Sequence, residues 1–212
     1  MTTLTTTNGF RVITSDWAPR RNLPHELGRA LWFPMWLMAA MGFGIGFVLA
    51  IVRANEIADG GSAETIAQLQ HVTAAFMFIG FAAVFAAISF AIARILGELR
   101  TGGGSVQEAA ARTVQTLPMP LTAKLFILSM AMAMMTILAA VVLHFVFAAD
   151  INASAASLED AEQRFIVLEG VRRIGISLYL ISFLLGLGTI INVLRFQSAR
   201  IRALPDEPPR AA

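Results

Sequence analysis

The chain has 212 residues, of which 57% are hydrophobic and 14% are charged, and its mean hydropathy is +0.69. This balance excludes an ordinary soluble domain and indicates an integral membrane protein. The absence of cysteine excludes disulfides, thiolate metal sites, iron–sulfur clusters and c-type haem attachment. The formal net charge is only +2, and we expect no nucleic-acid partner.

The first 22 residues are polar and lack the apolar core of a signal peptide. We therefore expect residues 1–22 to form a cytoplasmic N-terminal tail ahead of a transmembrane domain over residues 23–203. Residues 204–212 combine three prolines with charged residues and cannot build a core. They predict a disordered cytoplasmic tail.

Four long stretches without charged residues predict membrane-spanning helices, at about residues 30–52, 71–93, 125–149 and 174–194. At about 1.5 Å of rise per residue, each helix is long enough to cross a hydrocarbon core of roughly 30 Å. Backbone groups in lipid must be hydrogen-bonded within the protein, and the short alternating pattern of barrel strands is missing. The predicted fold class is an all-α integral membrane protein, a four-helix transmembrane bundle.

The distribution of positive charge predicts the orientation. The N-terminal tail, the middle loop and the C-terminal tail carry twelve of the sixteen Lys and Arg residues, whereas the two other loops carry four, against eight acidic residues. Cytoplasmic segments of membrane proteins are enriched in Lys and Arg. Both termini are therefore expected in the cytoplasm, and the chain is expected in a plasma membrane, as a multi-pass protein of a bacterial inner membrane.

The loops contain signals for helix ends. The glycine break at 60–62 precedes a helical pattern that continues into the second span, and Ser157 begins a capping pattern ahead of the fourth. Helices two and four are thus expected to extend on the outer side of the membrane. Ser105 and Glu108 match a capping box, which predicts a separate short cytoplasmic helix ending before Pro118.

An internal repeat relates the two halves of the chain. A shift of 94 positions aligns the two Leu-Pro-x-x-Leu segments that begin at Leu23 and at Leu117. The alignment predicts two pseudo-repeated helical hairpins, related by a pseudo-two-fold axis along the membrane normal. A true duplication and the chance identity of apolar segments both account for it.

Small residues mark a close-packing face on the first span. Gly42, Gly46 and Ala50 recur at every fourth position, a spacing that lets helix backbones approach closely. This ridge fits packing within the bundle and packing against another protein, and we favour the first interpretation.

Four side chains that could bind a cofactor are expected at the outer ends of the spans: His71, His144, Arg172 and Arg173. The two histidines could ligate a b-type haem whose propionates pair with the arginines. With Glu169 or Asp150 as a third ligand, the histidines could instead hold Zn²⁺ or Cu²⁺. The alternative, which we favour, is that they are structural histidines in hydrogen bonds, with neither metal nor cofactor.

Three functions fit these patterns. The chain shows no catalytic motif, and its predicted spans lack the deep charged residue typical of proton-coupled carriers. We favour a non-catalytic small integral membrane subunit or accessory protein, acting through helix packing with other membrane subunits or with itself in the lipid bilayer. The alternatives are a haem- or metal-binding electron-transfer subunit and a small-solute transporter or channel that acts as an oligomer.

Overall fold

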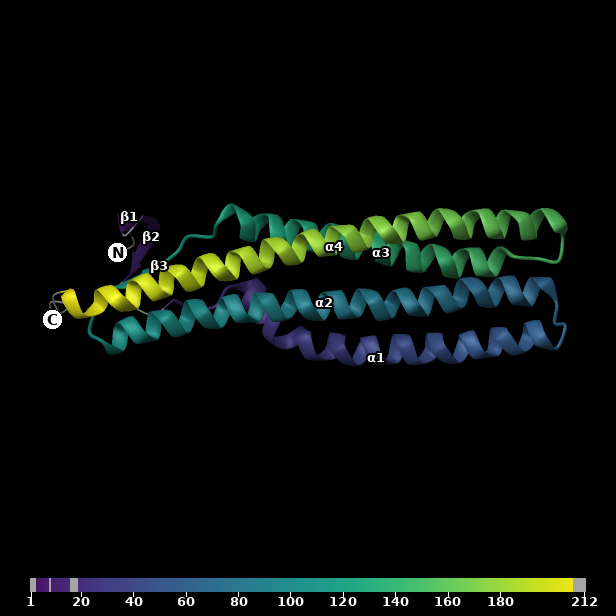
Figure 1. Cartoon of the computed structure of the whole chain (residues 1–212), viewed down its shortest axis with the longest axis horizontal. Coiled ribbons are helices and arrows are strands. Elements are labelled where there is room, and N and C mark those ends of the chain that lie inside the picture. The colour runs from purple at the N-terminus through teal and green to yellow at the C-terminus, as the bar shows by residue number, and fades with distance from the viewer. Residues whose placement is uncertain (1–2, 8, 16–18, 208–212) are drawn as a thin grey trace. The chain divides into compact units, whose positions relative to one another are not determined.

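The computed structural model describes residues 3–7, 9–15 and 19–207. These residues include four long helices that pack as a bundle: α1 (Leu23–Ala58), α2 (Ala63–Ala109), α3 (Leu121–Asp150) and α4 (Ala155–Ala203), all seen in Figure 1. Each helix is long and apolar enough to cross a membrane. The structure therefore confirms a bundle of four candidate membrane spans, as in a multi-pass membrane protein.

The four helices contribute to two compact units. The terminal unit comprises Met1–Trp32, Ile88–Ile127 and Ser182–Ala212, and the hairpin unit comprises Phe33–Ala87 and Leu128–Ile181. The hairpin unit contains the connection from α1 to α2 and the connection from α3 to α4 (Figure 1). The terminal unit contains the β-strands and the connection from α2 to α3.

In the hairpin unit, α1 packs closely on α2 at glycines. A Cβ atom added to Gly42 would lie 2.7 Å from the backbone nitrogen of Gly80, and one added to Gly46 would meet the side chain of Met77. Beside this contact, the rings of Phe43 and Phe81 meet edge to face with centroids 5.0 Å apart. The Gly42 and Gly46 positions of the predicted ridge therefore serve packing within the chain.

Helix α2 is the central helix of the hairpin unit. Its side chains meet α3 through Phe76 and Phe145, and α4 through Phe85 and Tyr179, with ring centroids 5.6 and 5.0 Å apart. Its buried alanines include Ala82, Ala83, Ala86 and Ala87. Small side chains at this spacing leave room for neighbouring helices on more than one face of α2.

Serine residues begin α2 and α4. The Ser62 Oγ accepts a hydrogen bond of 3.1 Å from the Thr65 backbone N–H, which places the start of α2 where the sequence predicts it. For α4 the predicted cap is wrong by three residues. Ser154, rather than Ser157, accepts the capping hydrogen bond, because the Ser157 hydroxyl instead accepts one from the Asn152 N–H.

The terminal unit contains a small antiparallel sheet that the sequence analysis did not predict. Strands β1 (Thr3–Thr7), β2 (Phe10–Ser15) and β3 (Val114–Thr116) lie in the order β1-β2-β3, and Ile13 of β2 pairs with Thr116 of β3. Val12 and Val114 are fully buried, and the Phe10 ring packs against Phe196 of α4. Part of the expected polar tail is therefore folded.

The separate cytoplasmic helix predicted from Ser105 is wrong. Helix α2 continues through three glycines to Ala109, and the chain then turns at Ala111, with φ of 53°, into β3. The glycines permit close contacts, because a Cβ atom at Gly103 or Gly104 would collide with Gln197 or Pro19. This packing offsets the low helix propensity of glycine.

The segment after α4 also differs from the prediction of disorder. Leu204–Asp206 forms a short 3₁₀ helix, η1, whose Leu204 side chain is buried. Arg112 donates a hydrogen bond of 3.1 Å from its Nε to the Leu204 carbonyl oxygen. The remainder of the predicted disordered tail, residues 208–212, lies outside the described residues.

The two Leu-Pro-x-x-Leu segments have different structures. Pro24 lies in the first turn of α1, whereas Pro118 lies in the connection before α3, which begins only at Leu121. The matching prolines therefore occupy different positions relative to their helices, and the duplication stays a prediction.

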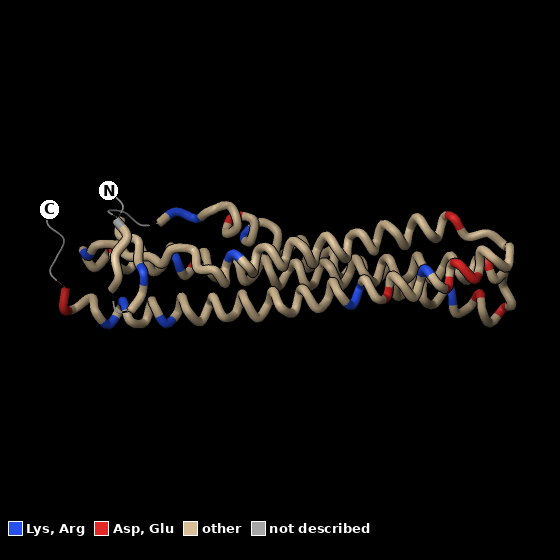
Figure 2. The backbone as a smooth tube through the Cα atoms, turned by 90° about the horizontal axis from the view of Figure 1, so that it is seen from above, with Lys and Arg blue, Asp and Glu red and all other residues tan. Residues whose placement is uncertain are grey.

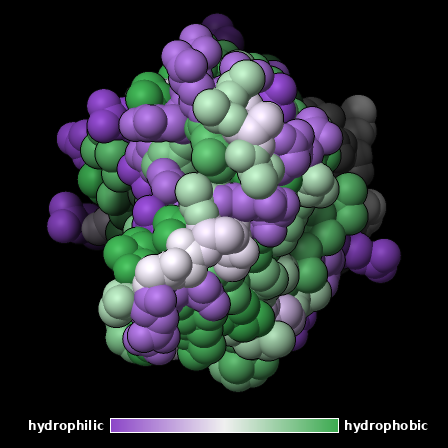
Figure 3. Space-filling view, turned by 90° about the vertical axis from the view of Figure 1, so that its right-hand side faces the viewer, coloured by the Kyte–Doolittle hydropathy of each residue, from purple (hydrophilic) through white to green (hydrophobic). Residues whose placement is uncertain are grey.

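Charge differs between the two units. The terminal unit contains twelve of the sixteen Lys and Arg residues of the sequence, and the hairpin unit contains four. Acidic residues gather around the two connections of the hairpin unit, as the red segments of Figure 2 show. The end of the molecule that carries these connections mixes hydrophilic with hydrophobic residues (Figure 3).

Candidate functional site

The structure brings together the two histidines that the sequence analysis singled out. His71 on α2 and His144 on α3 lie side by side in the hairpin unit, with their Nδ1 atoms 3.0 Å apart. Their exposed fractions are 1% and 0%. The structure therefore brings the two histidines together, and their direct contact is a hydrogen bond between the two rings.

The hydrogen bonds around the pair assign a protonation pattern to neutral rings. The Nε2 of His71 lies 3.1 Å from the Ala161 carbonyl oxygen of α4, which can only accept, so this nitrogen carries the hydrogen. The Nδ1 of His71 is then the acceptor, and His144 donates from its own Nδ1. The Nε2 of His144 is left with a lone pair, and it has no hydrogen-bond partner among the described residues.

Aromatic rings surround the histidine pair. Phe78 of α2 and Phe165 of α4 meet the His144 ring with centroids 5.0 and 5.6 Å apart, and Phe165 also meets the His71 ring at 5.5 Å. These contacts are edge to face. They fix the ring orientations in an apolar environment, where each imidazole hydrogen bond is stronger than it would be in water.

The two arginines expected at this site, Arg172 and Arg173, have different surroundings. Arg172 lies over the Phe78 ring, with its Cζ 5.1 Å from the ring centroid, and forms an ion pair with Glu169 one turn earlier on α4. Arg173 is exposed. Asp150 lies 3.5 Å from Arg164. Within the described residues, no group of three or more His, Cys, Asp and Glu side chains could hold a metal ion.

The geometry bears on the haem hypothesis for His71 and His144. Two axial ligands bind an iron from opposite faces of the haem, with the macrocycle between the rings. Here the facing nitrogens are hydrogen-bonded to each other, 3.0 Å apart. A haem that used both histidines would have to separate the rings, whereas a ligand at the His144 Nε2 would leave their hydrogen bond in place.

A second buried polar cluster, in the terminal unit, was missed by the sequence analysis. Arg200 of α4 and Gln107 of α2 are 2% and 0% exposed, and the Arg200 Nε donates a hydrogen bond of 2.8 Å to the Gln107 Oε1. Arg200 also donates to the Thr113 carbonyl oxygen, at 3.1 Å, and to both carboxylate oxygens of Glu207. The hydrogen bonds from Arg200 lower the pKa of the Glu207 carboxyl group.

Gln107 links this cluster to the sheet. Its amide nitrogen donates to the carbonyl oxygens of Gly103 and Gln115, and its amide oxygen accepts a hydrogen bond of 2.8 Å from the Gln115 N–H. The cluster therefore joins α2, β3, α4 and the chain after α4. In sequence, Arg200 is one of several arginines in an expected cytoplasmic tail, and no local pattern distinguishes it from its exposed neighbour Arg202.

The four candidate membrane-spanning helices are those of a helical, multi-pass membrane protein. Comparison with known proteins adds no identity, since no family model, curated protein or solved structure matches the chain.

Proposed function

We propose that this protein is a non-catalytic, small integral membrane subunit or accessory protein of a larger membrane assembly. The observation that carries the proposal is a continuous exposed face on α1 in the hairpin unit, made of Leu37, Met41, Gly44, Val48 and Ile51. These residues follow one another at alternating steps of four and three, the spacing of helix-to-helix contacts. In the most apolar 18-residue segment of α1 only 17% is buried, compared with 50% in the corresponding segment of α2.

Glycine at the centre of this exposed face favours a protein partner over lipid alone. Gly42 and Gly46 are occupied by contacts with α2, but a Cβ atom added to Gly44 would meet nothing within 4 Å. Lipid chains need no small residue there, whereas the backbone of a second transmembrane helix can approach closely at glycine. The partner is another membrane subunit or a second copy of this chain.

Association through the exposed face of α1 is tested by purification in mild detergent followed by native mass spectrometry. We expect the wild-type chain to be recovered with a partner or as an oligomer. Gly44→Leu should reduce the associated fraction at least fivefold, because the added side chain separates the backbones. Met135→Leu, at an exposed position of α3, should leave association unchanged. A wild-type protein that is monomeric and partner-free in every mild detergent would contradict the proposal.

The proposed orientation in a plasma membrane has its own test. The terminal unit contains twelve Lys and Arg residues, and the preference of these residues for cytoplasmic segments supports a cytoplasmic location for it. Cysteine introduced at Ser105 should react with a membrane-impermeant thiol reagent only after permeabilisation, and cysteine introduced at Ser154 should react in intact cells. The chain has no native cysteine to interfere. Labelling in the reverse pattern would show that the chain has the opposite topology to the one proposed.

A haem- or metal-binding electron-transfer subunit is the second candidate. His144 favours it, because its Nδ1 is held by His71 while its Nε2 is unpartnered among the described residues. Metal-ligating histidines characteristically have the other ring nitrogen held by a hydrogen bond.

Absorbance and metal analysis of the pure protein decide between the candidates. From cells supplied with haem and trace metals, we expect a colourless, metal-free preparation in which His144→Gln preserves expression and association. A Soret band that is lost in His144→Ala and retained in His25→Ala would instead support the electron-transfer subunit.

A further inference from the structure

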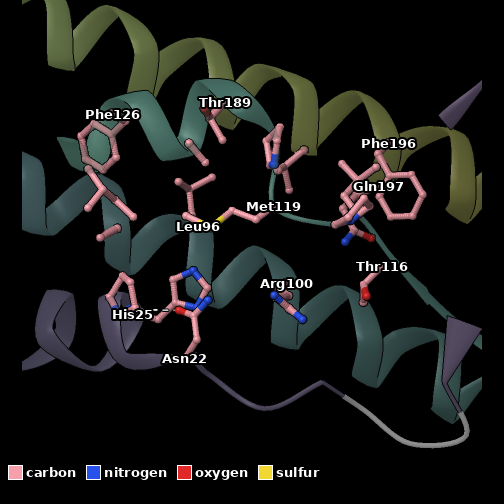
Figure 4. A pocket seen from close by; sticks show the side chains of 18 residues that line it. Asn22, His25, Leu96, Arg100, Thr116, Met119, Phe126, Thr189, Phe196 and Gln197 are labelled. Atoms are coloured by element: carbon pink, nitrogen blue, oxygen red, sulfur yellow. Dashed lines mark hydrogen bonds between the residues drawn. The ribbon is translucent and has the colours of Figure 1, made fainter. Parts of the chain in front are cut away.

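A pocket of about 90 Å³ lies within the terminal unit. Its walls come from the start of α1, from α2, from the connection between β3 and α3, and from α3 and α4 (Figure 4). Apolar side chains form most of the lining, including Leu96, Phe126, Ile127 and Val193. The pocket is smaller than an engineered cavity of about 150 Å³ that accepts benzene, so it fits a few methylene groups and excludes a haem-sized ligand.

Arg100 lies apart from Phe126 in the pocket. Figure 4 shows Phe126 at one end, here called the apolar end, and Thr116 and Gln197 toward the other, the polar end, where Phe196 also lies. Arg100 is nearer the polar end, and His25 lies toward the apolar end. The charge of Arg100 suits the polar end to a headgroup phosphate, and Phe126 suits the apolar end to methylene groups.

Arg100 gives the polar end an uncompensated positive charge. Within the described part of the chain, Arg100 has no ion pair, and its buried Nε has no hydrogen-bond partner. Arg21, by contrast, lies 2.8 Å from Glu98. Burial lowers the pKa of Arg100. It also lowers the pKa of His25, and the charges of Arg100 and Arg21 add to that effect. A partly buried guanidinium is stabilised most by an anion that also accepts its hydrogen bonds.

The depth of the pocket matches an amphipathic ligand. On α2 the lining extends from Ala93 to Arg100, and on α4 from Thr189 to Gln197. The apolar spans predicted from the sequence end at about residues 93 and 194, so the pocket crosses the predicted boundary between hydrocarbon and headgroups. Phospholipids place apolar chains and a phosphate on the two sides of this boundary.

We infer that this pocket binds an anionic phospholipid, with its phosphate at Arg100 and a few methylene groups of one acyl chain beside Leu96 and Phe126. The rest of the lipid lies outside the pocket. The inference is independent of the proposed subunit function, since it concerns the terminal unit and requires no protein partner.

Native mass spectrometry of the full chain, with phosphatidylglycerol and phosphatidylcholine of identical acyl chains, tests the inference. We expect phosphatidylglycerol to be retained at least fivefold more than phosphatidylcholine. Arg100→Gln should abolish this preference, and Arg100→Lys should keep part of it. Arg195→Gln is the matched control, because Arg195 is exposed on α4 of the same unit and outside the pocket lining. Equal losses in Arg100→Gln and Arg195→Gln would overturn the inference.

A second variant tests the apolar end of the same pocket. Ala123 is buried in the lining, and Ala123→Leu should occupy the space of the acyl chain and reduce phosphatidylglycerol retention at least threefold. Circular dichroism checks that each variant keeps its helical content. If Arg100→Gln does not fold, Ala123→Leu alone tests the inference. Inorganic phosphate or laurate should compete for the pocket less effectively than phosphatidylglycerol does. Equal competition by either of them would show that the occupant is not a phospholipid.

Discussion

Replacing Gly42 with leucine is expected to destabilise the protein by about 3 kcal/mol, the upper range for overpacking of a well-packed interior. The reason is steric: even a Cβ atom at this position would lie 2.7 Å from the Gly80 nitrogen and 2.9 Å from its Cα. Both contacts are with backbone, which cannot rotate away as a side chain can. Helices α1 and α2 would have to separate, and the contact between Phe43 and Phe81 would be lost with them.

The matched control for this prediction is Gly44→Leu, in the same helix, where a Cβ atom meets nothing within 4 Å. It changes helix propensity by a similar amount and should leave the thermal midpoint of the monomer close to that of the wild type. Thermal unfolding of the monomeric fraction in detergent, followed by circular dichroism, measures both variants, because Gly44→Leu is also expected to change association. Equal midpoints for Gly42→Leu and Gly44→Leu would show that the close contact between α1 and α2 does not limit stability.

Replacing Arg200 with alanine is expected to lower the free energy of unfolding of the terminal unit by about 3 kcal/mol. Removing one member of a buried ion-pair network leaves its partners uncompensated. Glu207 would lose hydrogen bonds to both of its oxygens, and the Thr113 carbonyl oxygen and Gln107 would each lose one. Hydrogen exchange measured by mass spectrometry should become faster in β3 and in the last turns of α2.

Arg202→Ala is the control for the Arg200 prediction, since Arg202 lies two residues later on α4 and is exposed. It removes the same charge without a buried partner, so exchange in β3 should not change. If both variants speed exchange equally, overall charge rather than the buried network holds the terminal unit together.

The four long apolar helices could be predicted because lipid imposes long uncharged helices, a constraint visible in single segments. The sheet could not be predicted in the same way. Phe10–Ser15 alternates apolar and polar residues only as far as Val12, which is too short for a strand signal. Its partner Val114–Thr116 is short and lies far along the chain. The predicted helix from Ser105 failed for a related reason, because the contacts of Gly103 and Gly104 are tertiary.

The histidine site could be predicted in part. The depth of His71 and His144 follows from counting residues along their helices, and depth was enough to predict that they share a site. Which way each ring faces depends on helix rotation, about 100° per residue, so their direct hydrogen bond and the role of the Ala161 carbonyl oxygen had no signal in the sequence. The same holds for Arg172, whose partners Phe78 and Glu169 are set by packing and by rotamer.

The pairing of β2 with β3 imposes an order on biosynthesis. The β1–β2 hairpin is complete once Ser15 has been made, but Ile13 must wait for Thr116, about a hundred residues later. At roughly 5–20 residues per second, this delay is about 5–20 s. During that time the free edge of β2 is exposed to other chains. The third strand therefore covers the free edge of β2 only after α1 and all of α2 have left the ribosome. The finished sheet thus marks a chain whose first helical hairpin is already made.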